Sequence, residues 1–250
     1  MSTIKENKIL GITITVQSKD TVLEKIKKYI DRPVGFFHIV SLNPENMIIA
    51  QESSQFKKVI ETAQIKIIDG IGIVLAGRLF NLNLERLTGV DLIKNLVNLA
   101  SNMRLRVLLI GGRPNLAESL ANCYRVEFSQ AKFKGVYGIK DIKKPTEKEE
   151  GRILSIVTAY KPHLVFVAFG SPDQELWLAR HKKEFSGIVA MGVGGAFDYL
   201  SGKIVRAPEF IRKIGCEWLY RLLKQPWRWK RQLRLIKFIK LVIEEKWKKR

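Results

Sequence analysis

The stretch LVFVAFGSPDQELWL, residues 164–178, joins an apolar run to a glycine and then to a helix-forming segment. Six consecutive apolar residues from position 164 suit a strand buried on both faces, as in a parallel sheet covered by helices. Ser171 as N-cap, Pro172 as the first helical residue and Gln174 three positions after Ser171 predict a capping box. Strand, turn and helix in this order predict one unit of an α/β fold.

The same alternation recurs along the chain. Strands are expected at 36–40, 65–68, 106–110, 133–137, 164–169 and 187–193, and helices at 89–103, 114–127 and 146–160. We therefore predict an α/β fold with a Rossmann-like, mostly parallel sheet flanked by helices. Alternation over residues 8–16 predicts a further hairpin or edge strand.

Strand signals stop after about residue 203, and the remainder reads as helical with breaks near Pro208 and Pro226. We predict an α/β core over residues 1–202 and a basic helical C-terminal appendage over residues 203–250. The net charge of the chain is +20, and residues 203–250 hold 16 Lys/Arg against 4 Asp/Glu. Charge concentrated in this way indicates an anionic partner near the C-terminus.

Two cysteines are too few for a disulfide scaffold, which favours a reducing compartment. The first residues lack a signal-peptide pattern, and no apolar run approaches the roughly 20 residues of a membrane-spanning helix. We expect an intracellular protein that is soluble or peripheral to a membrane.

Polar residues at the ends of the expected strands are the candidate site residues, because ligands of parallel sheets bind at the carboxyl ends of the strands. Asp69 directly follows the strand at 65–68. A carboxylate there can act as a general base, with its pKa tuned by burial. It can equally be the N-cap of a helix over residues 71–79.

Other strand ends also allow a structural and a functional interpretation. Asn43 suits the N-cap of a helix that begins at Pro44, and Ser41 and Asn43 can instead hydrogen-bond a polar ligand. Arg86 is either a surface arginine or a partner for an anion or a carboxylate. Gln174 can face a ligand as well as cap its helix.

Two glycine pairs follow expected strands. Gly111 and Gly112 precede a helix opened by Pro114, which suits a phosphate or ribose cradle. The full G-x-G-x-x-G pattern is missing, so a dinucleotide site is not supported. Gly194 and Gly195 allow close approach either of a ligand or of packed backbone.

No metal or cofactor is expected. His38, His163 and His181 are isolated from one another and from cysteines. The chain has no Asp-X-Asp pair, no P-loop and no G-x-S-x-G elbow.

In this order, the strand-end segments resemble the WecG/TagA/CpsF family of bacterial glycosyltransferases. The resemblance spans residues 37 to 231 and rests on SLNPE, DGIGIV, LERLTGVDL, LLIGG, FVAFGSPDQELW, MGVGGAFDYLSGKIVRAP and GCEWLYRLLKQPWRWKR. It implies a Rossmann-like, metal-independent and inverting enzyme. Such an enzyme moves a sugar, often N-acetylmannosamine or its uronic acid, from a UDP donor to a polyprenyl-diphosphate-linked sugar in the synthesis of teichoic acid or surface polysaccharide.

The resemblance also implies roles for single residues. Asp69 matches the aspartate proposed as catalytic base, and Ser41 stands where many relatives have threonine. Positions around the pocket are matched by Asn43, Arg86 and Gln174, and C-terminal arginines that reach over it are matched by Arg221, Arg228 and Arg231. These arginines would stabilise the diphosphate charge of leaving UDP, since guanidinium groups suit phosphate oxygens.

The last segment, QPWRWKRQLRLIKFIKLVIEEKWKKR, predicts a helix with more than one apolar side. One face of the helical wheel carries Trp229, Leu233, Ile236, Ile239, Ile243 and Trp247, most Lys/Arg lie opposite, and Phe238 and Leu241 fall outside both groups. This pattern fits a helix that touches both its own protein and anionic lipid on the inner face of the cell membrane. The alternative is a helix docked on its own domain with a solvated basic face.

Two other functions follow from bulk features. The net charge fits a nucleic-acid-binding protein, but the basic helix has no readout motif, so we expect no nucleic acid partner. A nucleotide-dependent oxidoreductase lacks its glycine fingerprint here. Glucose or N-acetylmannosaminuronic acid are alternative donor sugars in capsule or exopolysaccharide synthesis, and a homo-oligomer is possible.

Overall fold

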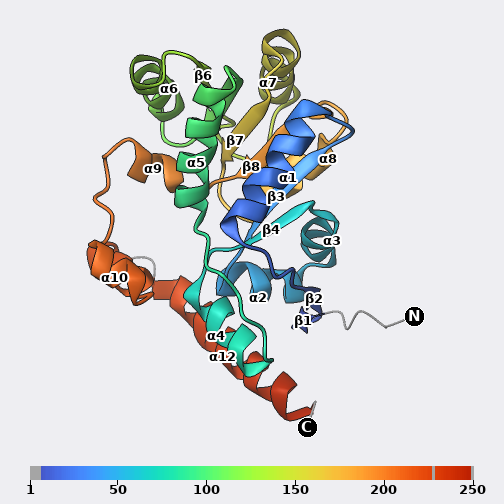
Figure 1. Ribbon diagram of the computed structural model, residues 1–250, viewed down its shortest axis with the longest axis vertical. Helices are drawn as coiled ribbons and strands as arrows, with labels where there is room; N and C mark the ends of the chain where they lie inside the picture. Colours follow the sequence, from blue (N-terminus) through green and yellow to red (C-terminus); the bar gives the residue numbers. More distant parts are fainter. Residues whose placement is uncertain (1–6, 227–228, 249–250) are drawn as a thin grey trace.

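The computed structural model describes residues 7–226 and 229–248, with the side chains of Lys213, Lys230 and Arg231 left aside. A six-stranded parallel sheet forms its centre (Figure 1). The sheet order is β4-β3-β8-β7-β5-β6, formed by β3 (Phe37–Leu42), β4 (Ile65–Ile68), β5 (Arg106–Gly111), β6 (Lys132–Val136), β7 (Leu164–Ala168) and β8 (Val189–Gly192). The predicted α/β class and all six predicted strands are confirmed.

The expected hairpin near the N-terminus is also present. It is a short antiparallel pair of β1 (Lys8–Ile9) and β2 (Ile12–Thr13), separate from the main sheet.

Helices cover both faces of the sheet, because side chains of each strand alternate between two buried layers. In β3, Ile39 points to one layer and Val40 to the other. The first layer is covered by α1 (Lys19–Asp31), α5 (Gly89–Asn102), α6 (Leu116–Glu127) and α9 (Ala196–Leu200). The second is covered by α2 (Pro44–Glu52), α3 (Ser54–Thr62), α4 (Ile71–Leu79), α7 (Glu147–Tyr160) and α8 (Asp173–Arg180).

The C-terminal residues form three helices, α10 (Glu209–Lys213), α11 (Glu217–Lys224) and α12 (Trp229–Lys248). Figure 1 shows α12 running beside α4, and it also packs on α2. Phe238 and Val242 are 2% and 3% exposed and belong to the same core cluster as those helices. The C-terminal helix therefore contributes to the hydrophobic core of the α/β unit.

Ion pairs reinforce this packing on the α2 side. Arg234 pairs with Glu45 at 2.8 Å, and Lys237 pairs with Glu52 at 2.6 Å. Both basic residues are half-exposed, so each pair contributes modestly and mainly fixes the orientation of α12.

The opposite face of α12 is apolar and exposed. This exposed face of α12 consists of Trp229, Leu233, Ile236, Ile239, Ile243 and Trp247, which are 44% to 74% exposed. The prediction of a helix with more than one apolar side is confirmed: Phe238, which lies outside this set, is buried against the protein. None of the helices in the described ranges is long and apolar enough to cross a bilayer.

The predicted capping box at Ser171 is wrong, and of the two alternatives for Asp69 the N-cap role is excluded. Ser171 does not cap α8, which begins at Asp173 with Pro172 in the N-cap position; the Ser171 hydroxyl instead donates to Glu175 Oε2 at 2.6 Å. Asp69 does not cap α4, because Gly70 occupies the N-cap position and lends no side chain. Asn43 does cap α2, accepting from the N–H of Asn46 at 2.9 Å.

Candidate active site

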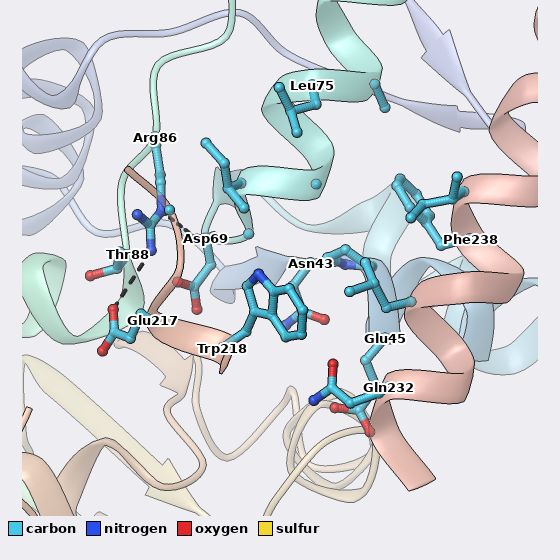
Figure 2. Close-up of a pocket in the computed structure, with 18 of the residues that line it drawn as sticks. Asn43, Glu45, Asp69, Leu75, Arg86, Thr88, Glu217, Trp218, Gln232 and Phe238 are labelled. Carbon is cyan, nitrogen blue, oxygen red and sulfur yellow. Dashed lines mark hydrogen bonds and ion pairs between the residues drawn. The ribbon is translucent and has the colours of Figure 1, made fainter. Parts of the chain in front are cut away.

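A cavity of about 590 Å³ opens at the carboxyl ends of β3 and β4, between those strand ends and the C-terminal helices (Figure 2). Its size is typical of a small-molecule site. Four predicted site residues line it, namely Asn43, Asp69, Arg86 and Arg221. The remaining polar lining comes from Glu45, Thr88, Tyr199, Arg206, Glu217, Trp218 and Gln232. The structure therefore joins predicted strand-end residues and the C-terminal appendage in one site.

Asp69 is held by the backbone at the end of β4. Its N–H donates to the carbonyl of Leu42 at 2.9 Å, which ties it to the end of the neighbouring strand. A Cβ on the following Gly70 would lie 2.7 Å from Pro44 Cδ, so this loop can approach α2 only with glycine there. The local sequence thus fixes where the Asp69 carboxylate enters the cavity.

The electrostatic surroundings of Asp69 suit proton abstraction. Burial raises the pKa of its carboxyl to about 6; Arg86 opposes the rise, and nearby Glu217 adds to it. Two smaller effects lower the pKa of Asp69, namely a hydrogen bond from the Gly89 backbone and the charge of Arg221. A carboxylate that titrates near pH 6 is largely ionised at neutral pH yet basic enough to accept a proton.

Arg86 links the Asp69 loop to the C-terminal helices. Its Nε donates to the Asp69 carbonyl at 3.0 Å and its Nη1 to the Arg212 carbonyl at 2.8 Å. Its Nη2 lies 3.7 Å from Glu217 Oε2. The guanidinium is thus engaged with protein on three sides, which supports a positioning role rather than direct ligand binding.

A second arginine, Arg206, completes this connection. It pairs with Asp91 Oδ1 at 2.6 Å and with Glu217 Oε1 at 3.3 Å, and it donates to Thr88 Oγ1 at 3.1 Å. Burial alone would raise the pKa of Asp91, but hydrogen bonds from Arg206 and Thr88, together with arginine charge, outweigh burial and hold the pKa below its usual value. The sequence did not single out Arg206 or Glu217. Arg206 meets Asp91 across 115 residues, and its pairing with Glu217 depends on how the chain folds between them.

Arg221 on α11 faces the cavity from the appendage. Its guanidinium stacks over the Tyr199 ring at 4.8 Å. Its Nε is buried and has no hydrogen-bond partner among the residues that the structure describes. A buried guanidinium N–H with no protein acceptor fits a site that receives an anionic oxygen from a ligand.

Ser41 and Asn43 lie beside Asp69 in different ways. Asn43 lines the cavity while its Oδ1 caps α2. Ser41 is 9% exposed within β3, and a Cβ on Gly89 would lie 3.5 Å from its Oγ and 3.8 Å from Asp69 Oδ2. The start of α5 at Gly89 therefore lies directly beside both side chains.

Gln174 is buried outside this cavity and holds two loops together. Its Oε1 accepts from the N–H groups of Gly170 at 3.1 Å and Gly194 at 2.9 Å, and its Nε2 donates to Glu175 at 2.8 Å. Gly195 follows, near Arg221: a Cβ there would lie 3.6 Å from Nη2 of that arginine. Gln174 thus shapes the glycine loop beneath Arg221.

Gly111 and Gly112 lie outside the cavity lining, at the end of β5. A Cβ on Gly111 would meet the Phe169 ring at 2.8 Å, and one on Gly112 would meet Leu116 at 3.2 Å. Both glycines have positive φ angles, of 87° and 81°. Packing accounts for their lack of side chains.

Two predicted arginines are not placed by the structure. Arg228 lies outside the described residues, and for Arg231 only the backbone, within α12, is described. Over the described part of the chain, no group of three or more His, Cys, Asp or Glu side chains is arranged to hold a metal ion.

The other end of the cavity is an apolar groove between α4 and α12. Its floor consists of Ala76, Phe238 and Val242, and its walls of Leu75, Leu79, Leu235, Ile239 and Ile243. Figure 2 shows Leu75 and Phe238 at this end and Asp69, Arg86 and Glu217 at the other. One continuous cavity therefore joins a charged end to an apolar groove.

A parallel sheet with a carboxylate of raised pKa at its strand ends, faced by arginines, is the arrangement of an α/β enzyme. The sequence model of the glycosyl transferase WecG/TagA/CpsF family matches residues 7–250, so the chain belongs to this family and is a glycosyltransferase.

Two curated relatives are similar over most of their lengths. A Bacillus subtilis (strain 168) protein is 32% identical over 220 residues, which cover 88% of this chain and 83% of the relative. A Bacillus spizizenii (strain ATCC 23059 / NRRL B-14472 / W23) protein is 32% identical over 219 residues, covering 86% and 82%. Both are named N-acetylglucosaminyldiphosphoundecaprenol N-acetyl-beta-D-mannosaminyltransferase.

Proposed function

We propose that this protein transfers N-acetylmannosamine from a UDP-sugar to the N-acetylglucosamine of a polyprenyl-diphosphate-linked acceptor, in the synthesis of teichoic acid or another cell-surface polymer. The observation that carries the proposal is the position of Asp69 in a cavity with a charged end and an apolar groove. The acceptor carries a sugar, a diphosphate and a hydrocarbon chain in that order, which matches a cavity that runs from Asp69 and the arginines to an apolar groove. The names of the relatives support the choice of both sugars.

Asp69 is the proposed general base. Its carboxylate removes the proton from the acceptor hydroxyl while that oxygen forms a bond to the anomeric carbon of the donor. The bond from that carbon to the UDP oxygen breaks, and its electron pair leaves with UDP. Direct displacement of this kind inverts the anomeric centre, and no covalent sugar–enzyme intermediate is formed.

Arginines are the proposed stabilisers of the leaving diphosphate. Arg221 presents a buried N–H at the cavity, and Arg228 and Arg231 follow it in the chain. Negative charge grows on UDP as the bond breaks, so fixed guanidinium groups act most strongly in the transition state. We propose that these cations make a divalent metal unnecessary. Ser41, Asn43 and Gln174 are proposed to shape the sugar pocket, and Gly111, Gly112, Gly194 and Gly195 to shape the backbone around the donor.

We further propose that the enzyme works on the cytoplasmic face of the membrane. The exposed face of α12 carries six large apolar side chains, with basic residues at both ends of the helix. Aromatic and aliphatic side chains with flanking Lys and Arg suit the surface of an anionic bilayer.

The proposal is tested with purified enzyme, a panel of UDP-sugars and a soluble lipid-diphosphate N-acetylglucosamine acceptor. We expect one product from UDP-N-acetylmannosamine, with inverted anomeric configuration by NMR and undiminished yield in EDTA. UDP-glucose and UDP-N-acetylmannosaminuronic acid are the competing donors. If none of the three UDP-sugars supported transfer, the proposed reaction would be contradicted. Loss of activity in EDTA would contradict metal independence.

A further inference from the structure

The groove between α4 and α12 has a defined direction. At its start, a Cβ on Gly72 would lie 3.8 Å from Leu235, and at its end Lys246 lies 5.6 Å over the Phe80 ring. Gly72 comes just after Asp69, so the two helices run side by side away from the charged end. At 1.5 Å per residue, the α4 wall extends for about 12 Å.

The floor and the walls of this groove differ in exposure. Ala76, Phe238 and Val242 on the floor are 2% to 3% exposed, whereas Leu75 and Ile243 on the walls are 52% and 44% exposed. The apolar walls therefore stand open to the surroundings over a closed floor. An exposed apolar surface of this shape marks a binding site for hydrocarbon.

We infer that the groove binds the isoprenoid chain of the lipid-linked acceptor next to its diphosphate. The inference rests on the proposed function and adds a subsite to it. The occupant must present an anion near Arg221 and hydrocarbon along α4, because one continuous cavity contains both surfaces. A polyprenyl diphosphate has this arrangement, whereas a peptide or a second copy of the chain would place no diphosphate at the charged end.

The groove also opens toward the exposed face of α12. Ile239 and Ile243 belong to both surfaces: they line the groove, and they are 49% and 44% exposed. A chain held in the groove can therefore continue into the lipid that this face is proposed to contact. The enzyme has to withdraw only the first part of the chain from the bilayer to bring the acceptor sugar to Asp69.

Direct binding tests the subsite without turnover, using farnesyl diphosphate, inorganic diphosphate and farnesol as probes in calorimetry with the full chain. We expect farnesyl diphosphate to bind at least about tenfold more tightly than inorganic diphosphate, because several methylene groups become buried. Farnesol should bind more weakly than farnesyl diphosphate, since it lacks the anion.

Two isoleucines of α12 provide a matched pair. Ile243→Asn changes a groove wall, whereas Ile236→Asn changes a residue that is 65% exposed and absent from the lining. We expect Ile243→Asn to weaken farnesyl diphosphate binding about fivefold and to leave inorganic diphosphate binding unchanged. Ile236→Asn should change neither affinity. Leu79→Asn, on the opposite wall, should repeat the effect of Ile243→Asn, and melting temperatures report whether each variant is folded.

Equal affinities for farnesyl diphosphate and inorganic diphosphate would overturn the inference, as would equal effects of the two isoleucine variants. A monomer–dimer equilibrium that shifts with Ile243→Asn but not with farnesyl diphosphate would assign the groove to a second copy of the chain instead. Farnesyl diphosphate binding without any sugar transfer would leave the groove standing and remove the proposed reaction. Sugar transfer without preference for the isoprenoid would leave the proposed reaction standing and remove the groove as an isoprenoid site.

Discussion

At its charged end the cavity is bounded by side chains that hold one another in place through ion pairs and hydrogen bonds, whereas its apolar groove is bounded by aliphatic and aromatic side chains. Arg86 and Arg206 each reach both an element of the α/β core and Glu217 of α11. Leu75 and Ile243 of the groove are about half exposed. The difference teaches that the proposed chemistry should depend on fixed charges, whereas the proposed lipid contact should depend on the apolar area of many side chains. Substitutions at the two ends should therefore differ in size of effect.

Removal of the carboxylate at the charged end should have the largest effect. We expect Asp69→Asn to lower kcat by about a thousandfold, because general base catalysis is lost while the shape of the side chain is kept. In the wild type, kcat/KM should fall as the pH drops through about 6, where Asp69 takes up a proton. Asp141→Asn, which changes an exposed loop carboxylate, is the matched control and should retain full activity.

The same variant should be more stable than the wild type at high pH. Because the folded protein holds the Asp69 proton more tightly than the unfolded chain does, the resulting stability is complete below pH 4 and is lost as the pH rises through about 6. Asn cannot ionise, so its free energy of unfolding at pH 8 should exceed that of the wild type by up to about 3 kcal/mol. Urea unfolding at pH 4 and pH 8 measures this, and an advantage independent of pH would show that another cause is at work.

Loss of the guanidinium fork from Arg221 should rank next. We expect Arg221→Gln to lower kcat on the order of a hundredfold, in line with the removal of one fixed donor from a charged transition state. Arg221→Lys keeps the charge but not the planar fork, so it should recover only part of the loss. Arg104→Lys, at an exposed position, is the control. A comparable rise in KM with an unchanged kcat would place Arg221 in ground-state binding instead.

Arg206 tests whether the appendage is held by its charges. Arg206→Met leaves Asp91 and Glu217 without their shared partner, and we expect unfolding free energy to fall by about 2 to 3 kcal/mol. The double variant with Asp91→Asn should lose less than the sum of the two single changes, because both remove one interaction. Additive losses in urea unfolding would show that the pair is not coupled.

The sequence predicted the sheet well because every strand carries its own signal. Runs such as LVFVA in β7 are apolar at each position, which a parallel strand covered on both faces requires. Asp69 and Asn43 were found because they lie directly after such runs. Their residue types and positions were local features that a single segment could show.

Contacts between distant segments were not predictable in this way. Arg206 meets Asp91 across 115 residues, and the apolar groove exists only because α12 returns to pack beside α4. Gln174 and Gly112 were candidate site residues because they follow strands, but neither segment alone could show that Gln174 holds two loops together or that Gly112 packs against Leu116. For the appendage, the helical wheel gave its two apolar sides, and tertiary packing decided which one became core.

The smallest expected effect concerns the exposed face of α12, where single side chains add area without fixing geometry. Trp247 is 74% exposed, and we expect Trp247→Ser to weaken binding to anionic vesicles by several-fold, as partial burial of one aromatic side chain suggests. Ile236→Asn should act similarly, and the two changes should add, because the residues lie three helical turns apart with no shared partner. Asp69→Asn should bind vesicles like the wild type, which separates lipid contact from chemistry. Vesicle flotation at low and high salt measures both contributions: unchanged binding in the double variant would show that α12 presents this face to something other than lipid.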